Sequence, residues 1–552
     1  MRVSRTTLAS LVALAGIMVL LAATSACSDV SVAAVPSPTP KPGGTYVIPL
    51  RSDPPSIAPL NVCDDASALV NHQVFQTLVR WETGSDGIVR GVPGLAKSWT
   101  VNDNATVWTF TLRRGVRFQP PVDREVTARD VVDDWDYLTD RANGSYVSYI
   151  LSSVEGTDSG GYAPKGLGGV KALGRYTLRV TLKYPFADFP LVLGSPATGI
   201  WPLDYMKKVS PQAFRNKPVG TGPYLVDRWV HGQYIDLVKN PDYWDPAHAG
   251  YVDRIHLPIM DVKTQWQAFQ KGTIDFTSVP PDQMAAARDR PEVRDGRWQA
   301  RAWPSLCVIF VGMSQKSQRV GGLANLRLRQ ALSYAVDRRA VIAAKDNASV
   351  PATGLVPTGI PRADDGGLAY PPDAAKAAQL AAQLSPAPTL RYLSFGVVPM
   401  ASDGLSALDA PLLSGWRSAG LDVERRGYEV NTYFRKVSMG TVGDLFLTGW
   451  VADYPSPDDF LYLLFHSGSS GVSSIATFYH STAVDRLLDE ARGTLDEHSR
   501  LELFAQAERK ILTDAPVIPL YFCRDFRVAN TRVQGQVLDP MGAMDMWKVW
   551  VK

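Results

Sequence analysis

The chain is poor in the residues on which metal and redox sites depend. Its 552 residues include 4 Cys, 7 His and 11 Met. Charged side chains make up 20% of the chain, and the net charge is only +3. This balance is not typical of a nucleic-acid-binding surface or of a polybasic membrane patch. We therefore expect no nucleic-acid partner, and charge alone does not indicate the ligand.

Short motifs typical of common enzymatic sites are also missing. The sequence has no G-x-x-x-x-G-K-[ST] phosphate loop, no H-E-x-x-H pair and no G-x-S-x-G nucleophile turn. Its His residues lack the short-range spacing of metal ligands. Asp458 and Asp459 fit charges at a helix start better than an acid/base pair. We therefore expect no enzyme activity, no cofactor and no metal site.

Strand-like and helix-like patterns occur throughout the chain. Residues 176–182 alternate apolar and polar side chains as a half-buried strand does, whereas residues 501–512 have an amphipathic helical face. Thr127 and Thr482 are each followed three positions later by Asp, which predicts two capping boxes. No repeat of fixed period is present, and the length suits two or three domains. These patterns favour a mixed α and β protein.

The N-terminus has the pattern of a secretory signal. Arg2 and Arg5 precede an apolar run at residues 8–23, and small residues then lead to Cys27. We predict a signal peptide over residues 1–26. The apolar run is close to the shortest length that spans a bilayer, about 17 residues, so an uncleaved membrane anchor is the alternative.

Small residues that end in Cys27 resemble a bacterial lipobox, although Thr24 stands where Leu is usual. The resemblance implies that the thiol of Cys27 carries lipid such as palmitate and that this residue becomes the new N-terminus. Two or more acyl chains anchor a protein stably, so we expect a lipoprotein at the extracytoplasmic face of the cell membrane. Residues 27–44 are rich in Pro, Ser and Thr and predict an extended tether.

Residues 219–244 predict a tight turn followed by a hairpin. Gly220 and Gly222 precede Pro223, and apolar residues on both sides of Gly232 predict two strands. This segment resembles the signature of the family 5 extracellular solute-binding proteins, which serve peptide, nickel and related ABC importers. Its residues have a scaffolding role on our interpretation and do not contact ligand.

Further segments resemble the same family in the same order along the chain. They are residues 43–60, 93–99, 107–118, 127–135, 326–342, 449–460 and 515–522. The resemblance implies an α/β fold of the periplasmic-binding-protein type, with two lobes, a hinge of two crossover strands and an extra subdomain in the first lobe. Residues 326–342 are expected to form one helix.

The family pattern also implies domain boundaries. It places the first lobe at residues 45–305, with the extra subdomain at about 77–199, the second lobe at 306–522 and a return to the first lobe at 523–552. Ligand is expected between the lobes.

Three Cys residues follow Cys27. In this family the strands that carry Cys307 and Cys523 approach the crossover between lobes, so the resemblance implies a disulfide between these two. Cys63 would then be left over. Three free buried thiols are the alternative.

The resemblance suggests ligand contacts in three places. Asp453 corresponds by motif to the acidic residue that pairs with the ligand α-ammonium in oligopeptide-binding relatives, and a turn or cap Asp is the alternative. Trp450 offers a flat apolar wall or is a core residue. The remaining candidates are a loop whose backbone meets peptide in those relatives, and two aromatic residues of the extra subdomain. These are Cys63, Asp64, Asp65, Tyr146 and Tyr149.

One expected part is missing, because residues 445–448 contain no Arg to meet a ligand carboxylate. Arg435 and Lys436 lie near another basic contact of the relatives, but solvation explains exposed helix charges equally well.

The leading hypothesis is a lipid-anchored, monomeric substrate-binding component that delivers oligopeptides to ABC transporter permease subunits. The alternatives are another cargo, such as a nickel chelate, haem or a glycan, or an envelope-regulatory lipoprotein without a transport role.

Overall fold

The computed structural model describes residues 39–62, 64–345, 348–364, 366–384, 387–395, 405–440, 442–470 and 477–552. The predicted signal peptide, most of the tether, Cys27 and Cys63 lie outside these residues. Residues 41–552 form one unit.

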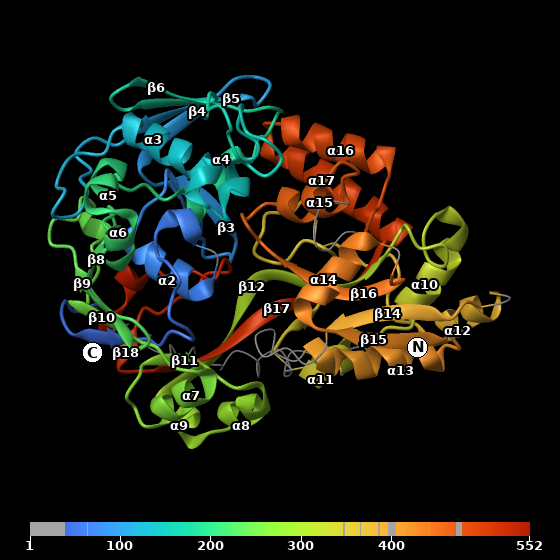
Figure 1. Ribbon diagram of the computed structural model, residues 1–552. Helices are drawn as coiled ribbons and strands as arrows, with labels where there is room; N and C mark the ends of the chain where they lie inside the picture. The colour runs from blue at the N-terminus through green and yellow to red at the C-terminus, as the bar shows by residue number, and fades with distance from the viewer. Residues whose placement is uncertain are drawn as a thin grey trace, which may run out of the picture. The chain divides into compact units, whose positions relative to one another are not determined.

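A seven-stranded sheet contains the two long strands β12 (Trp298–Met313) and β17 (Val517–Asn530), which run antiparallel side by side (Figure 1). Both strands were expected from the sequence around Cys307 and at residues 515–522. The strand order is β11-β17-β12-β16-β14-β15, with β13 beside β17. The shorter strands are β11 (Phe276–Ser278), β13 (Val350–Pro351), β14 (Leu390–Phe395), β15 (Val423–Tyr428) and β16 (Leu445–Val451).

Alternation along β16 explains why helices cover both faces of this sheet. Leu445 and Leu447 are buried against one group of helices, whereas Phe446 packs with Tyr433 and Val437 of α14 (Val430–Met439) on the other side. Successive side chains of a strand point to opposite faces, so both faces need an apolar cover. The first group is α10 (Leu326–Tyr334), α11 (Arg338–Lys345), α12 (Ala374–Ala382) and α13 (Asp409–Ser418).

The prediction of one helix over residues 326–342 is wrong. The chain forms α10 and α11 with a break between them. Asp337 causes the restart, because its Oδ1 accepts hydrogen bonds from the backbone N–H groups of Arg339 at 2.9 Å and Ala340 at 3.2 Å. Apolar spacing continues across the break, so periodicity alone did not reveal it.

A four-stranded sheet carries the predicted hairpin. Its order is β1-β10-β9-β8, with β1 (Thr45–Val47), β8 (Tyr224–Val230), β9 (Tyr234–Lys239) and β10 (Arg254–Pro258). Gly232 turns between β8 and β9 with φ +72°, which confirms the hairpin. Gly220 and Gly222 pack against the end of α2 (Asp65–Val74), where a Cβ would clash with the backbone oxygens of Gln73 and Val74. The signature glycines therefore serve packing.

A second four-stranded sheet lies in the predicted extra subdomain. Its order is β4-β5-β7-β6, with β4 (Ala96–Val101), β5 (Val107–Leu112), β6 (Val170–Gly174) and β7 (Thr177–Thr181). Strands β2 (Val79–Thr83) and β3 (Val89–Pro93) pair separately. The helix α3 (Ala128–Thr139) begins with the predicted capping box between Thr127 and Asp130.

The second predicted capping box does not form. The N-cap of α16 (Thr482–Gly493) is Ser481, one residue before Thr482. The carboxylate of Asp485 accepts a hydrogen bond from the backbone N–H of Ser467 at 2.9 Å instead. A contact with a distant loop replaces the local one.

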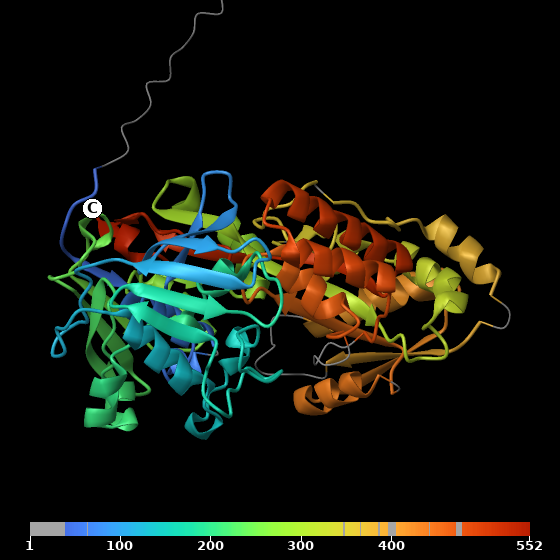
Figure 2. The same cartoon turned by 90° about the horizontal axis from the view of Figure 1, so that it is seen from above.

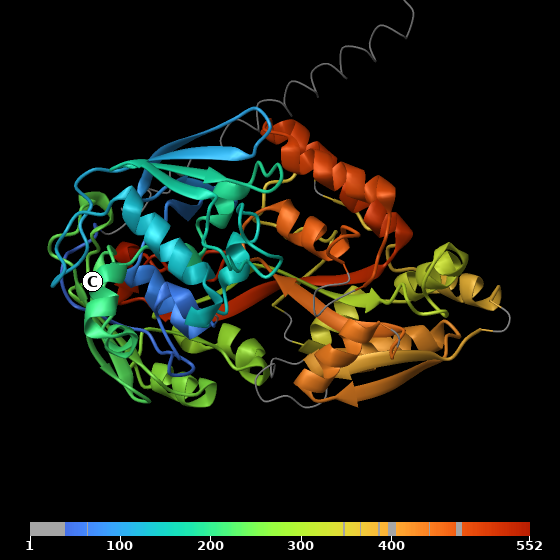
Figure 3. The same ribbon diagram turned by 45° about the horizontal axis from the view of Figure 1, so that its top comes forward.

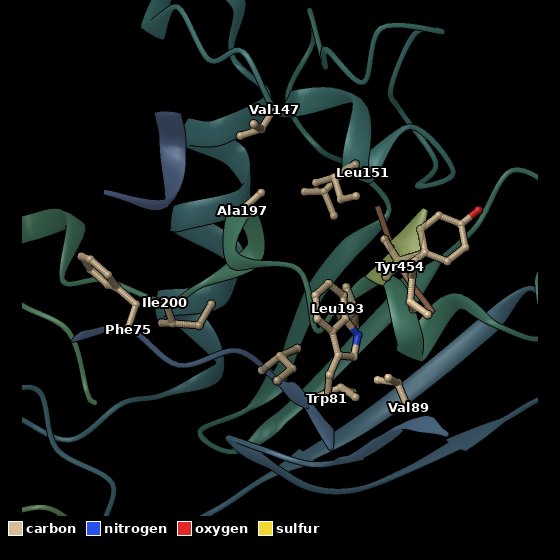
Figure 4. Close-up of a cluster of buried hydrophobic side chains, with 14 of the residues drawn as sticks. Phe75, Trp81, Val89, Val147, Leu151, Leu193, Ala197, Ile200 and Tyr454 are labelled. Carbon is tan, nitrogen blue, oxygen red and sulfur yellow. The ribbon is translucent and has the colours of Figure 1, made fainter. Parts of the chain in front are cut away.

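The helices α15 (Pro457–Phe465), α16 and α17 (Glu497–Asp514) lie beside the extra subdomain (Figure 3), and their buried side chains belong to the same core cluster. Tyr454, just before α15, lies in the same cluster as Trp81, Leu151 and Leu193 (Figure 4). The backbone N–H of Ala187 donates to the carbonyl oxygen of Arg492 at 2.7 Å. Part of the predicted second lobe therefore packs into the core of the predicted first lobe.

The C-terminal residues return to the strand that opens the folded chain. β18 (Val533–Gln534) pairs with β19 (Trp550–Val551), and Val551 lies against Gly44 just before β1. Figure 2 shows the C-terminus beside the blue segment that opens the described chain. The remaining helices are α4 (Phe189–Val192), α5 (Leu203–Val209), α6 (Pro211–Asn216), α7 (Val262–Gln270), α8 (Met284–Arg288) and α9 (Pro291–Arg294).

A disulfide joins Cys307 of β12 to Cys523 of β17, with their Cα atoms 5.2 Å apart. It lies where the pairing register between the two strands shifts, between Pro304 and Val308. In this stretch the covalent bond holds the two long strands together where regular backbone pairing is interrupted.

We expect loss of this disulfide to destabilise the protein. The two residues are 216 positions apart, so Cys307→Ser together with Cys523→Ser should lower the free energy of unfolding by about 2–4 kcal/mol. Denaturant titration of the unreduced proteins measures this, with Cys63→Ser as the control that should change little. Peptide mapping that finds Cys63 in the bridge would contradict the expectation.

Candidate ligand site

A short turn after β16 carries Trp450 and Asp453. The backbone N–H of Ala452 donates to the carbonyl oxygen of Leu306 on β12 at 2.8 Å. The next residue, Asp453, donates its backbone N–H to Oδ2 of Asp459 at 2.9 Å. Ser456 caps α15 by accepting a hydrogen bond from the backbone N–H of Asp458 at 3.1 Å. The turn is therefore fixed at both ends by secondary structure.

The carboxylate of Asp453 is half-buried and faces the extra subdomain. Its Oδ1 accepts a hydrogen bond from the hydroxyl of Tyr149, in the 3-10 helix η3 (Ser148–Leu151), at 3.1 Å. Desolvation raises the pKa of Asp453 to about 6, although the bond from Tyr149 acts to lower it. Because Ser456 is the cap of α15, Asp453 does not have the cap role considered as an alternative. The structure thus brings two candidates from distant parts of the chain into contact.

Large apolar side chains are exposed on the two segments that carry Asp453 and Tyr149. Tyr149 is 45% exposed and Tyr146, three residues earlier, is 72% exposed. Val451, two residues before Asp453, is 65% exposed. Exposed apolar groups beside a charged group are typical of binding surfaces. Sequence reasoning missed Val451, because an apolar residue at the end of a buried strand gives no sign of exposure.

The loop before α2 lies beside the aromatic segment, since the hydroxyl of Ser145 donates to the carbonyl oxygen of Leu60 at 3.0 Å. Asp64 is the N-cap of α2, and its Oδ1 accepts a hydrogen bond from the backbone N–H of Ser67 at 2.9 Å. Asp65 is an exposed residue of the first helical turn. The side chain of Asp64 is therefore committed to the helix.

Trp450 has a mixed environment. Its ring is partly buried and packs against the core, while its Nε1–H donates to Oδ2 of Asp459 at 3.0 Å. The packing of the ring thus fits the core role that the sequence allowed for this residue. The two basic residues considered as further contacts both lie on the helix α14. Arg435 is exposed, and the ammonium of Lys436 lies 4.7 Å from the ring centre of Tyr428.

Two buried acidic residues follow the turn, at the start of α15. Asp458 and Asp459 both occupy the first turn of α15, as expected for helix-start charges. Asp458 also forms a bidentate ion pair with Arg492 of α16, at 2.6 and 2.8 Å, and both side chains are buried. Sequence reasoning missed this pair, because its partners are 34 positions apart.

Within the described parts of the chain, no group of three or more His, Cys, Asp or Glu side chains is placed to hold a metal ion.

Over the same residues, no helix combines the length and the apolar composition needed to cross a bilayer.

The two long shared strands, the extra subdomain and the carboxylate turn define a two-lobed solute-binding protein. Residues 90–471 match the middle region of the bacterial extracellular solute-binding proteins, family 5, and the chain belongs to this family. It is 28% identical over 529 residues to the heme-binding protein A of Haemophilus influenzae, covering 90% of each chain. It is 27% identical over 551 residues to the periplasmic oligopeptide-binding protein OppA of Salmonella typhimurium, covering 96% of each. The structure of HbpA2 from Haemophilus parasuis matches with a TM-score of 0.81 at 22% identity, over 92% of this chain and 100% of that one.

Proposed function

We propose that the protein binds oligopeptides between its lobes and delivers them to the permease of an ABC importer. The observation that carries the proposal is the half-buried Asp453 carboxylate, which is held on a rigid turn and forms no ion pair with any basic side chain among the described residues. A carboxylate in this setting suits the α-ammonium group of a peptide, because a charge-assisted hydrogen bond compensates for desolvation.

The strand β16 supplies the second requirement, a backbone that an extended peptide can pair with. Within the described residues β14 pairs with β16 only at Leu445 and Phe446, whereas β12 pairs with β16 up to Val451. The edge from Thr448 to Val451 leads directly to Asp453. Backbone pairing gives affinity with little dependence on ligand side chains. Ligand that contacts both lobes would then favour a closed arrangement over an open one.

Haem is the second candidate, because a relative named for haem binding is among the most similar proteins. The Asp453 carboxylate counts against it, since it would repel the propionate groups of haem. Mass spectrometry of whatever co-purifies with the protein tests both candidates. Bound peptides with free amino termini support the proposal, whereas a porphyrin mass with its visible absorption overturns it.

The anchor proposed at Cys27 has its own test. Labelled palmitate should attach to the full-length protein, and Cys27→Ala should abolish the label because it removes the thiol at the lipobox-like position. Cell fractionation then follows the protein between the membrane and soluble fractions. Recovery of the unaltered protein with residues 1–26 still attached would contradict the lipoprotein assignment.

We also propose that the protein is not an enzyme, in keeping with a family of solute-binding proteins. The candidate ligand residues that the structure describes are carboxylates and aromatic side chains, which suit contacts with a ligand.

A further inference from the structure

Asp459 lies in the first turn of α15, next to the turn that carries Trp450 and Asp453, and its side chain is fully buried. Its Oδ2 accepts two hydrogen bonds, from Nε1 of Trp450 at 3.0 Å and from the backbone N–H of Asp453 at 2.9 Å. Its Oδ1 is buried and has no hydrogen-bond partner. Oδ2 of Asp459 therefore fixes two candidate ligand residues, whereas Oδ1 has no hydrogen bond to compensate for its desolvation.

The groups that face this carboxyl are acidic or already committed. The carboxylate of Asp453 lies nearby on the turn, and it already accepts a hydrogen bond from the hydroxyl of Tyr149 in η3. Asp458 is adjacent on α15 and receives Arg492 from α16 as well as the hydroxyl of Tyr454 at 2.7 Å. Among the residues that the structure describes, no basic side chain forms an ion pair with Asp453 or Asp459. The positive charge of Arg492 is used by Asp458.

These surroundings favour the neutral form of Asp459. Burial raises the pKa of this carboxyl well above its usual range, and the nearby Asp453 carboxylate raises it further. A buried anion with an unpaired oxygen and no counter-charge is much more costly than a neutral carboxyl in the same place. The neutral form still accepts both N–H groups through Oδ2.

We propose that Asp459 is a positioning residue of the ligand site that stays uncharged at neutral pH. It holds Trp450 and Asp453 in place and leaves the turn at residues 450–453 with a single negative charge, that of Asp453. The inference rests on the proposed function, because it assigns the site a ligand group with one positive charge, such as an α-ammonium.

The protonation state can be tested without ligand. Infrared difference spectra between the wild-type protein and Asp459→Asn, recorded at pH 7, should show the C=O stretch of a protonated carboxyl that the substitution removes. Asp453→Asn is the matched control and should keep this band. A difference spectrum that shows the loss of an ionised carboxylate would overturn the proposal.

The positioning role is tested by calorimetry with tetra-alanine and its N-acetylated form as probes. Asn keeps an acceptor for both N–H groups, so Asp459→Asn should bind tetra-alanine within about threefold of the wild type. Asp459→Ala leaves both N–H groups unpaired and should weaken this binding at least roughly tenfold, with a smaller loss for the acetylated probe.

Each outcome decides a different point. Equal losses for the two probes with Asp459→Ala indicate a merely structural role and overturn the proposal, as does an Asn variant as weak as the Ala variant. Thermal unfolding of both variants confirms that they fold. If the wild type binds no peptide, the proposed function fails, while the infrared result still decides the state of Asp459.

Discussion

Asp453→Asn should weaken the binding of a peptide with a free amino terminus roughly tenfold to a hundredfold, because a hydrogen bond to a charged group contributes about 1.5–3 kcal/mol. The side chain keeps its shape and its contact with Tyr149, so the change removes charge with little effect on packing. Calorimetry measures the loss. N-acetylation of the peptide should cause a similar loss, since it removes the same charge pair from the other side.

A double cycle separates one shared interaction from two independent effects. If Asp453 receives the ammonium, the variant and the acetylated peptide together should cost much less than the sum of the two single losses. Additive losses, or tight binding by Asp453→Asn, would remove Asp453 from the site. Thermal unfolding of the variant serves as the control for folding.

The charge of Asp453 also sets a pH dependence. Its pKa is raised to about 6 in the ligand-free protein. Bound ammonium favours the ionised form, so affinity should be full above this pH and should fall as the pH decreases through about 6. In Asp453→Asn this dependence should disappear.

Asp458→Ala should lower the free energy of unfolding by about 3–5 kcal/mol, because it leaves the buried guanidinium of Arg492 without its partner. Denaturant titration measures the loss. The matched control is Asp133→Ala, which removes one partner of an exposed pair on α3. There the side chain of Arg129 is 74% exposed and that of Asp133 is 37% exposed. The expected cost of that control is about 0–1 kcal/mol.

Replacing both partners tests the reason for this loss. Asp458→Leu together with Arg492→Met should recover part of the stability, because no unpaired charge remains in the core. A loss for Asp458→Ala no larger than that of the exposed control would show that the pair contributes little.

Local pattern was sufficient for much of the fold. The hairpin around Gly232, the capping box at Thr127 and the amphipathic helix α17 follow from alternation, spacing and turn residues that lie close together in sequence. The break between α10 and α11 could not be predicted in this way, because the apolar spacing continues across it and the signal is a single polar side chain, Asp337.

The site was predictable only in its most distinctive residues. The resemblance pointed to Asp453 and Tyr149, and the structure brings them within hydrogen-bond distance. Asp458 and Asp459 look alike in sequence, yet one is paired with Arg492 and the other holds the turn. That difference depends on which side chains of α16 and β16 lie beside them in the fold. The residues next to Asp458 and Asp459 in the sequence do not indicate these partners.

The shared core of α15 to α17 and the extra subdomain limits how the protein can be divided for biochemical work. An excised fragment of residues 306–522 would lose part of this core, since the ring of Tyr454, for example, packs edge-on against that of Phe186. A new apolar surface of this kind promotes aggregation. Fragments for crystallisation or biosensor design should therefore keep both parts of the chain in one polypeptide.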